Sequence, residues 1–446
     1  MGRLFGTDGV RGVANRELTP ELAFQLGRAA ASVLAADGDR SRILIGRDTR
    51  VSGEMLEAAL TAGFTSVGAD VVRLGIIPTP GVAYLTRIMG AGAAAMISAS
   101  HNPVPDNGIK FFAGDGYKLP DEVEDEIERL IRSEVDQLPR PTGTEVGRVH
   151  DVPDSWRRYA DFLRDTCPVS LAGLKIVVDC GYGAAYLVAP TVLRELGAEV
   201  IALHAEPDGG KINVRCGSTH PAPLQQAVVA HGAHLGLAHD GDADRVMAVD
   251  EGGALVDGDH LMAVCALERL AKDTLPKGAI AATVYSNLGL QTALREAGGT
   301  VVVTPNGDRY VLEAMRREGL AIGGEQSGHI IFLEHNTTGD GILTALQLLG
   351  TMVRDGRPLS VLAAQMPTFP QILENVPVAA KERLGGNEAI QEAVATAEEE
   401  LSGRGRIFVR ASGTESLVRV LAEGPDAEEL RRIVDGVAVV VQRELS

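Results

Sequence analysis

One arrangement of residues recurs three times along the chain: a short apolar run, a loop with glycine or aspartate, and an amphipathic helical pattern. The apolar runs occupy 43–48, 175–179 and 279–284, and the helical patterns after them end near residues 68, 196 and 297. Short continuous apolar strands that alternate with helices are typical of α/β domains with buried sheets. The irregular spacing between the units excludes a solenoid of stacked repeats. The pattern predicts one α/β module used three times.

The last part of the chain follows a different plan. A helix is predicted over 387–401, strands over 406–409 and 417–421, and a final helix after them. This order indicates a small α+β domain. A length of 446 residues also exceeds one core, since domains usually hold about 100–200 residues. Changes in composition along the chain therefore predict four domains, at 1–152, 153–255, 256–370 and 371–446.

Charge and composition exclude several classes of protein. The formal net charge of −18 argues against a sequence-independent nucleic-acid binder, which needs a basic surface. No apolar run approaches the ~18–20 residues that span a bilayer, and the first residues lack the apolar core of a signal peptide. The cysteines have no Cys-x-x-Cys spacing, which favours reduced thiols over disulfides or zinc. We therefore expect a cytoplasmic protein without nucleic-acid or membrane partners; the four cysteines are Cys167, Cys180, Cys216 and Cys265.

A polar loop follows the apolar run at 91–97. It reads SASHNP at 98–103 and continues as DNGIK at 106–110. Pro103 and the pair Asn107-Gly108 predict turns rather than a continued helix. The sequence therefore predicts a buried strand that ends in a tight polar loop.

The same loop carries three groups that suit chemistry. A strand end that presents a serine, here Ser100, is a common way to hold a nucleophile or a phosphate carrier. His101 adds an imidazole and Lys110 an amine. The alternative is an ordinary loop that follows a strand and is rich in turn-forming residues, with no role in chemistry.

A second loop, DGDADR at 240–245, lies between apolar runs at 235–238 and 246–249. Its three carboxylates alternate along the chain and would repel one another without a cation. Oxygen ligands favour Mg²⁺ or Ca²⁺ over zinc. The candidate metal ligands are Asp240, Asp242 and Asp244.

Three interpretations of this acidic loop are considered. An EF-hand would need glycine at the position of Arg245, and the flanking runs are predicted strands rather than helices. A solvated acidic turn is the second. The third is a Mg²⁺ site with an incomplete protein shell, which a phosphate oxygen completes; Arg245 beside it would suit a phosphate. The sequence favours the third.

A third loop reads GGEQSGH at 323–329. Glu325 and Ser327 offer an acceptor and a hydroxyl that suit sugar hydroxyls, and His329 suits acid/base work or a phosphate contact. The alternative is a turn with a solvated glutamate. The loop is therefore a candidate sugar site.

Two further loops suit anions. RASGTE at 410–415, with Arg419 behind it, combines arginine, hydroxyls and glycine in a candidate phosphate nest, although it lacks the Gly-Lys-Ser/Thr of a P-loop. GTDGVRG at 6–12 is glycine-rich, and its Arg11 could reach an anion. The alternatives are a polar hairpin loop and a flexible N-terminal loop.

With these motifs in this order, the chain resembles the α-D-phosphohexomutase superfamily over essentially its whole length. The resemblance implies three similar α/β domains with mixed sheets and a smaller C-terminal α+β domain around a central cleft. FGTDGVRG at 5–12, GEQSGH at 324–329 and TGDG at 338–341 resemble the branch that acts on glucosamine phosphates. The branches for glucose or mannose phosphates typically have Glu-Met-Ser-Gly-His in the sugar loop.

The resemblance implies a role for each motif residue. Ser100 would carry a phosphate in the active enzyme, and one Mg²⁺ would bind per chain. The residues matched to the metal are Ser100, Asp240, Asp242 and Asp244. Those matched to catalysis are Ser100, His101, Lys110, Arg11 and His329. Those matched to substrate binding are Glu325, Ser327, Arg245, Arg410, Ser412, Gly413, Thr414 and Arg419.

The implied reaction converts glucosamine 6-phosphate and glucosamine 1-phosphate into each other through phosphoserine 100 and a bound 1,6-bisphosphate. Such an enzyme is an isomerase, specifically an intramolecular phosphotransferase, and it acts in amino-sugar and peptidoglycan-precursor synthesis. The resemblance also implies glucosamine or glucose 1,6-bisphosphate as the activator and a homodimer as the oligomeric state. The rivals are a phosphomannomutase or phosphoglucomutase, a phosphatase, and a non-catalytic binding protein regulated by its phosphoserine.

The chain departs from the family's pattern in two loops. The phosphate loop has Ala411 where lysine is expected and Ser416 where proline is expected. The third-domain loop has Pro305 and Asn306 where Lys-Val is more common before Gly-Asp-Arg. These differences would affect phosphate affinity and the local loop path, and they leave the metal and serine motifs intact.

Overall fold

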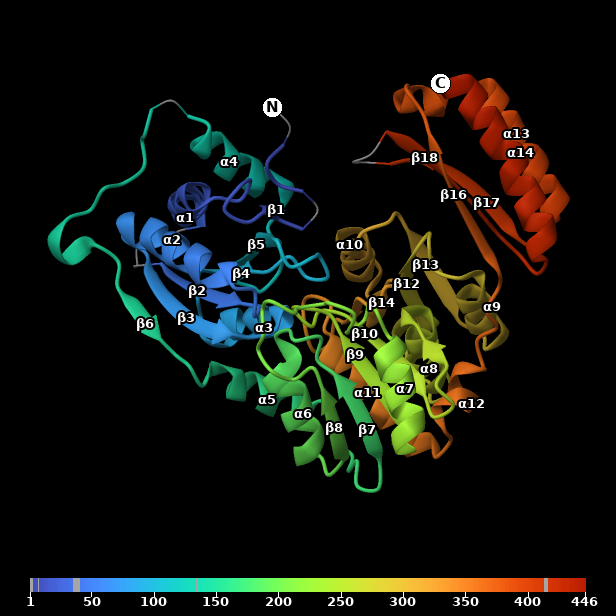
Figure 1. Ribbon diagram of the computed structural model, residues 1–446, viewed down its shortest axis with the longest axis horizontal. Coiled ribbons are helices and arrows are strands. Elements are labelled where there is room, and N and C mark those ends of the chain that lie inside the picture. Colours follow the sequence, from blue (N-terminus) through green and yellow to red (C-terminus); the bar gives the residue numbers. More distant parts are fainter. Residues whose placement is uncertain (1–2, 7, 35–40, 134, 413–415) are drawn as a thin grey trace. The chain divides into compact units, whose positions relative to one another are not determined.

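The computed structural model describes residues 3–6, 8–34, 41–133, 135–412 and 416–446. The chain forms two compact units, one of Met1–Val284 with Gly299–Gln365 and one of Tyr285–Gly298 with Met366–Ser446. Among the described residues the first unit carries three mixed sheets and the second unit carries an antiparallel sheet (Figure 1). This agrees with the predicted α/β fold class with a smaller C-terminal α+β part.

The first sheet has the strand order β1-β5-β4-β2-β3-β6, in which β2 is parallel to β3 and β4 while β5 is antiparallel to β4 and β1. The strands are β1 (Val10–Val13), β2 (Arg42–Arg47), β3 (Asp70–Ile76), β4 (Ala93–Ile97), β5 (Asp106–Ala113) and β6 (Val149–Asp151). The helices are α1 (Pro20–Leu34), α2 (Ser52–Ser66), α3 (Thr79–Ile88) and α4 (Asp121–Ile131). Every residue of β4 is buried, as its apolar run predicts.

The turn predicted at Asn107-Gly108 is wrong. Both residues lie inside β5, where Asn107 pairs with Gly12 and Gly108 with Arg11 of β1. The chain reverses earlier, between Ser100 and Pro105. Pairing with a distant strand overrides the local turn preference of Asn-Gly, because the sheet satisfies the backbone groups that a turn would otherwise use.

The second sheet has the order β11-β10-β9-β7-β8, and the third β13-β12-β14-β15. The elements around the second sheet are α5 (Ser155–Asp165), β7 (Lys175–Asp179), α6 (Ala185–Glu195), β8 (Glu199–Leu203), α7 (Ala222–His231), β9 (Leu235–His239), β10 (Val246–Asp250) and β11 (Leu255–Val256). Those around the third are α8 (Gly258–Ala271), β12 (Ala279–Thr283), β13 (Thr300–Thr304), α10 (Asp308–Glu318), β14 (Ile322–Gly324), β15 (Ile330–Phe332), α11 (Gly341–Asp355) and α12 (Leu359–Ala363).

The second unit is built on the antiparallel order β16-β18-β17. Its elements are α9 (Leu288–Glu296), β16 (Gln371–Pro377), α13 (Glu388–Leu401), β17 (Arg406–Ala411), β18 (Leu417–Glu423) and α14 (Ala427–Leu445). Helix α9 is the helix of the third predicted module, yet it groups with this unit. The N–H of Leu288 donates to the buried Glu423 carboxylate at 2.6 Å, which anchors the start of α9 on β18.

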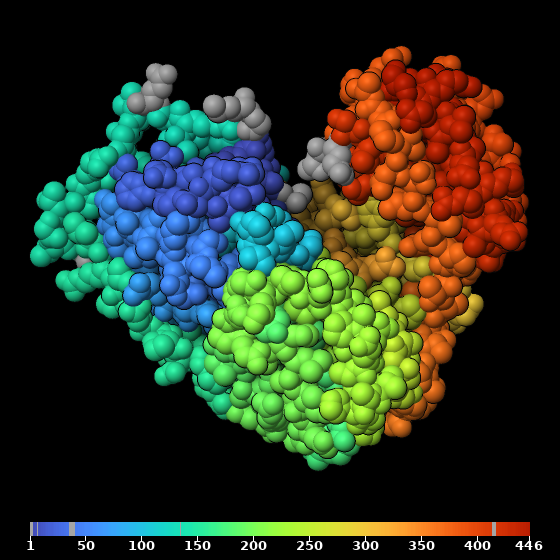
Figure 2. Space-filling view, viewed as in Figure 1, coloured from blue at the N-terminus to red at the C-terminus, as the bar shows by residue number. Residues whose placement is uncertain are grey.

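The first and second sheets belong to neighbouring domains whose surfaces meet within the first unit (Figure 2, blue and green). The N–H of Thr79 donates to the carbonyl of Asp242 at 3.0 Å, and the Thr49 hydroxyl donates to the carbonyl of Tyr182 at 2.6 Å. These contacts fix the acidic loop of the second domain against the first domain.

Asp340, in the TGDG segment, is a buried connector of the first unit. It caps α11 by accepting from Leu343 N–H at 2.9 Å, and its other oxygen accepts from the Tyr159 hydroxyl at 2.8 Å and from Asn336 at 3.1 Å. Asn336 also donates to the carbonyl of Pro80. The segment thus joins the three domains of this unit through hydrogen bonds.

Within the described part of the chain, every helix is too short or too polar to span a membrane.

Candidate active site

Ser100 lies directly after β4 in a strained backbone conformation. Its φ is 51°, a left-handed value that costs a non-glycine residue about 1–2 kcal/mol. Its side chain is buried, its N–H donates to the Ser98 hydroxyl at 2.8 Å, and its hydroxyl donates to Asp240 at 2.5 Å. The strand end therefore directs this hydroxyl at the acidic loop, as a phosphate carrier beside a metal requires.

The acidic loop curls between β9 and β10 so that its three carboxylates converge. Oxygens of Asp240, Asp242 and Asp244 all lie within 4.8 Å of one another, and all three residues are buried. Strands on both sides exclude an EF-hand, which needs helices there. The curled loop includes Ala243 with a φ of 57°, a second strained non-glycine position.

These carboxylates fit a hard divalent cation. Burial, together with the charges of Asp244 and Asp242, raises the pKa of Asp240 well above its usual value, whereas Lys110 and His329 outweigh burial and lower the pKa of Asp244. Among the residues that the structure describes, one buried oxygen each of Asp242 and Asp244 has no hydrogen-bond partner. Unpartnered buried oxygens are costly unless something binds them. Three carboxylates and a nearby hydroxyl are oxygen ligands that suit Mg²⁺. Water or phosphate oxygens would complete its coordination shell.

Cationic and imidazole groups surround the triad. The Lys110 ammonium lies 3.1 Å from Asp242 and 3.6 Å from Asp244; burial opposes its charge, but these two carboxylates raise its pKa overall. His329 lies 3.5 Å from Asp244 through Nδ1 and 3.5 Å from Asp308 through Nε2. Burial and the charges of Arg245 and Arg11 lower the pKa of His101 to about 4, so it is neutral at neutral pH.

A polar cavity of 140 Å³ opens beside Ser100. It is lined by Asp8, Arg11, Ser100, Asp244, Arg245, Asn306, Gly307, Asp308, Glu325 and His329. Ser327 is not one of the lining residues, but its hydroxyl donates to Glu325, which is, at 3.1 Å. The structure thus brings the predicted serine, metal and sugar motifs of the first unit to one place.

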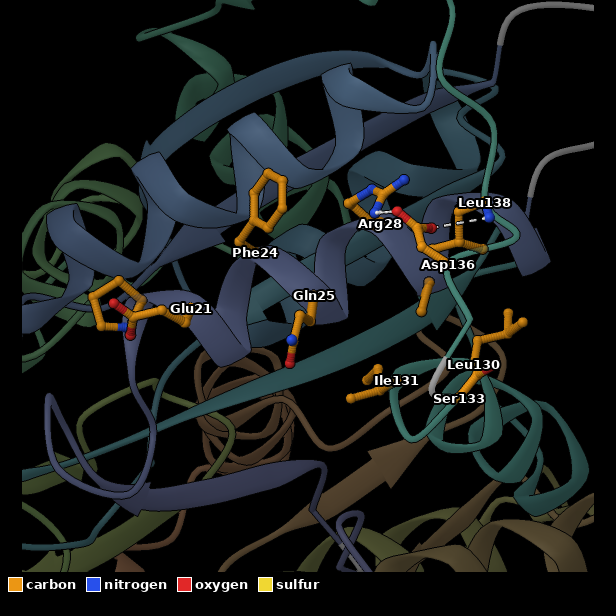
Figure 3. Close-up of a pocket in the computed structure, with 11 residues that line it drawn as sticks. Glu21, Phe24, Gln25, Arg28, Leu130, Ile131, Ser133, Asp136 and Leu138 are labelled. Atoms are coloured by element: carbon orange, nitrogen blue, oxygen red, sulfur yellow. Dashed lines mark hydrogen bonds and ion pairs between the residues drawn. The ribbon is translucent and has the colours of Figure 1, made fainter.

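A larger groove of 580 Å³ lies elsewhere, between α1 and the segment that follows α4 (Figure 3). Its walls are mainly apolar, and an ion pair of 2.8 Å joins Arg28 to Asp136 across one end. It contains none of the motif residues. Volume alone does not locate chemistry, so the smaller cavity is the candidate active site.

The phosphate motif lies in the second unit. Arg410 and Arg419 face each other as a directly paired position of β17 and β18. Like charges opposite each other destabilise a sheet pair, and an anion bound to both would relieve this. The Lys381 ammonium donates to the carbonyl of Ser412 at 2.7 Å. Gly413 and Thr414 lie outside the described residues.

Comparison with known proteins identifies the group to which this combination belongs. Four family models match in order, described as phosphoglucomutase/phosphomannomutase alpha/beta/alpha domains I, II and III and the C-terminal domain. They cover residues 2–137, 157–253, 257–369 and 373–439. The chain belongs to the phosphoglucomutase/phosphomannomutase family.

Full-length relatives narrow the position within this family. A phosphoglucosamine mutase of Heliobacterium modesticaldum is 58% identical over 459 residues, which covers 99% of this chain and 100% of the relative. One of Moorella thermoacetica is 60% identical and covers 98% of each chain. Among solved structures, a phosphoglucomutase/phosphomannomutase family protein of Burkholderia thailandensis matches with a TM-score of 0.83 at 25% identity, covering 99% of this chain and 97% of the other.

A fungal structure shares the fold at lower identity. An N-acetylphosphoglucosamine mutase of Aspergillus fumigatus, described in complex with GlcNAc-6P and magnesium, matches with a TM-score of 0.72 at 18% identity. The match covers 99% of this chain and 96% of the other. At this identity it shows that the mutase fold is shared.

Sequence reasoning missed Arg50, which holds the serine loop of this family member together. The buried guanidinium donates to four backbone carbonyls of the loop at 2.6 to 3.0 Å, and its Nε lies 3.1 Å from Asp48. Asp48 in turn accepts from the Ser98 hydroxyl at 2.7 Å. The segment GRDTR at 46–50 carried only the signal of a polar loop after a strand. The four carbonyl acceptors are those of Ser100, Asn102, Pro103 and Asp106.

Sequence reasoning also missed Asn213, whose amide donates to the carbonyl of Ser100 at 2.9 Å. Its loop is anchored by Asp179, which accepts from the N–H groups of Gly181 and Gly217 and lies 2.9 Å from His204 Nδ1. Asp179 and His204 also group with Cys216 as possible metal ligands. Both Asp179 oxygens already accept hydrogen bonds, so they are engaged in holding the Asn213 loop rather than a metal. The three residues Asp179, His204 and Cys216 therefore support the serine loop.

Gln326, the residue by which the sugar loop differs from the Glu-Met-Ser-Gly-His pattern, does not line the cavity. Its amide donates to Asp257 at 3.2 Å, and its carbonyl accepts from Gly258 N–H at 3.0 Å. A Cβ at Gly258 would collide with the carbonyl of Glu325. Gln326 thus anchors the loop to the start of α8 and leaves Glu325 to face the cavity.

The four departures from the family pattern have distinct places. Ala411 pairs with Val418 at the end of β17, and the carbonyl of Ser416 accepts from Val378 N–H at 3.1 Å. The Pro305 carbonyl accepts from the Thr304 hydroxyl at 3.0 Å. Asn306 lines the active-site cavity. Only this last departure lies where it can touch a substrate in the first unit.

Proposed function

We propose that the chain is a phosphoglucosamine mutase, which interconverts glucosamine 6-phosphate and glucosamine 1-phosphate through a phosphoserine at position 100. The observation that carries this proposal is the Ser100 hydroxyl, 2.5 Å from the buried Asp240 and at the wall of a polar cavity. The names of the full-length relatives support the amino sugar as substrate.

The reaction moves a phosphoryl group twice. The C1 hydroxyl of glucosamine 6-phosphate attacks the phosphorus of phosphoserine 100, so a sugar O–P bond forms while the Ser100 O–P bond breaks. The proton lost by the sugar hydroxyl ends on Ser100. The resulting 1,6-bisphosphate turns over, and its 6-phosphoryl group returns to Ser100 in the same way. Positioning and charge stabilisation supply most of the acceleration in such transfers.

The residues around the cavity divide these tasks. Asp240, Asp242 and Asp244 would hold Mg²⁺, which when bound supplies positive charge opposite the transferring phosphoryl group. Lys110, Arg11 and His329 hold protons or positive charge near the reacting oxygens, and His101 packs beside Ser100. Glu325 and Ser327 bind sugar hydroxyls. Phosphate groups are bound by Arg245 and, from the second unit, by Arg410, Ser412, Gly413, Thr414 and Arg419.

The remaining features follow the same proposal. Glucosamine or glucose 1,6-bisphosphate would act as activator by phosphorylating Ser100. Resemblance to the superfamily supports a homodimer. It also supports four domains in each chain, at 1–152, 153–255, 256–370 and 371–446. The four cysteines are free and buried, which supports the reducing cytoplasm as its location.

The substrate assignment is tested by comparing kcat/KM for glucosamine, glucose and mannose 6-phosphates on the phosphorylated, Mg²⁺-loaded protein. Glucosamine 6-phosphate is expected to be preferred by tenfold or more, about 1.4 kcal/mol of transition-state discrimination. A preference for glucose or mannose would make the chain a sibling mutase. Phosphate that leaves Ser100 for water without bisphosphate formation would indicate a phosphatase.

Metal removal should stop the reaction reversibly. After chelation, activity is expected to fall at least about 100-fold, because the converging carboxylates then oppose the incoming phosphate charge; added Mg²⁺ should restore it. Calorimetry gives a second readout: Mg²⁺ should raise the melting temperature of the wild type more than that of Asp242→Asn. Equal shifts in the two proteins would mean that the ion binds away from the triad.

A further inference from the structure

Glucosamine 6-phosphate differs from glucose 6-phosphate only at C2, where an ammonium group replaces a hydroxyl. An enzyme of the proposed function discriminates best with a buried acceptor whose charge matches that ammonium. The inference therefore rests on the proposed function and asks which side chain selects the amino group.

Most carboxylates around the cavity are already engaged. Asp244 belongs to the metal triad. One oxygen of Asp8 lies 3.2 Å from Arg11 and the other 2.9 Å from Lys118. Glu325 accepts from the Ser327 hydroxyl at 3.1 Å, and the proposed function already assigns this pair to sugar hydroxyls. Gln326 is turned to Asp257 and lies outside the cavity lining.

Asp308 is the remaining carboxylate of the cavity wall. It is the first residue of α10, and Gly307 before it has a φ of 126°, which only glycine adopts readily. Its Oδ2 accepts from the Lys118 ammonium at 2.5 Å and lies 3.5 Å from His329 Nε2. Among the hydrogen bonds of the described residues, Oδ1 of Asp308 has no donor.

The surroundings of Asp308 keep it charged and fixed. Burial opposes ionisation, but Lys118 and His329 lower the pKa of Asp308 overall. Lys118 is itself held between Asp308 and Asp8, so the carboxylate cannot rotate freely. Its side chain is 16% exposed, which leaves it shielded from bulk water yet open to the cavity.

We propose that Asp308 selects the amino sugar by accepting a charge-assisted hydrogen bond from the C2 ammonium through Oδ1, with Lys118 as the positioning residue that holds the carboxylate. A C2 hydroxyl can also donate to Oδ1, but it lacks the positive charge. A charged donor contributes roughly twice as much as a neutral one. Asp308 is therefore the specificity-determining residue of the cavity.

The test compares Asp308→Asn with the matched control Glu313→Gln, which removes a carboxylate charge from an exposed position of the same helix. In both variants kcat/KM is measured for glucosamine 6-phosphate and glucose 6-phosphate. In Asp308→Asn the ratio of the two is expected to fall about tenfold or more, mainly through KM for the amino sugar. In Glu313→Gln the ratio should stay at the wild-type value.

The outcomes separate this inference from the proposed function. If the wild type shows no preference for glucosamine 6-phosphate, the proposed function fails. If the wild type prefers it and Asp308→Asn keeps the preference, or loses both activities equally, only the role of Asp308 is overturned. If Asp308→Asn does not fold, Asp308→Glu and Asp308→Gln provide a second comparison, because their side chains are of equal size and only the first carries a charge. The preference should then survive in the first and disappear in the second.

Discussion

Replacement of Ser100 by alanine is expected to abolish mutase activity, with a loss of at least about 10⁴-fold in kcat, because the phosphoryl group then has no protein oxygen to occupy between its two transfers. The hydroxyl lies 2.5 Å from Asp240 and 1% of the residue is exposed, so water cannot easily take its place. Activity is measured from glucosamine 6-phosphate with glucosamine 1,6-bisphosphate present.

Mass spectrometry provides the complementary measurement. Wild-type protein incubated with the bisphosphate should carry one phosphate on Ser100 and lose it to added sugar phosphate, while Ser100→Ala carries none there. Ser66→Ala, a serine of α2 outside the cavity, should behave as the wild type. Sugar phosphate turnover by Ser100→Ala at near wild-type rates would refute the phosphoserine mechanism. A phosphate on Ser100 that never exchanges with sugar would instead indicate a regulated binding protein.

Replacement of Arg50 by methionine should produce the second largest effect. The substitution removes one donor from each of four loop carbonyls and removes the ion-pair partner of the buried Asp48. Breaking a buried ion pair from one side costs about 3–5 kcal/mol. A displacement of the Ser100 hydroxyl by about 1 Å lowers the rate about 100-fold. We expect both losses, measured by denaturant unfolding and by kcat.

Arg47→Met is the matched control for Arg50. Arg47 lies three residues earlier and pairs with Glu54 and Glu57 rather than with the serine loop. It should lose little activity, because its partners lie on α2 rather than on the serine loop; loss of the largely buried Arg47–Glu57 pair should instead lower stability. If Arg50→Met keeps wild-type kcat, the strained conformation of Ser100 is maintained without Arg50. In that case Asn213 and the Ser98 hydroxyl would be the groups that hold the loop.

The fold class and the motif loops could be predicted from the chain alone, since local chemistry decides them. Buried strands need continuous apolar runs, as in 93–97, and converging carboxylates need short spacing, as in 240–245. The sequence identified Gln326 as a marker of the sugar loop, but it did not predict the hydrogen-bond partner of this residue. The Gln326 amide donates to Asp257, which lies 69 positions earlier in the chain. Spacing along the chain carries no information about such a pair.

The sequence by itself determined the buried strands, the acidic loop and the serine that follows β4, because burial and turn formation depend on neighbouring residues. Only the tertiary structure decided that Asn107-Gly108 extends β5, that Arg50 ties the serine loop and that Lys118 joins Asp8 to Asp308. Each of these depends on contacts between residues that lie far apart along the chain. Such pairing is set by the packing of the whole unit, because hydrogen bonds form wherever packing brings donors and acceptors together.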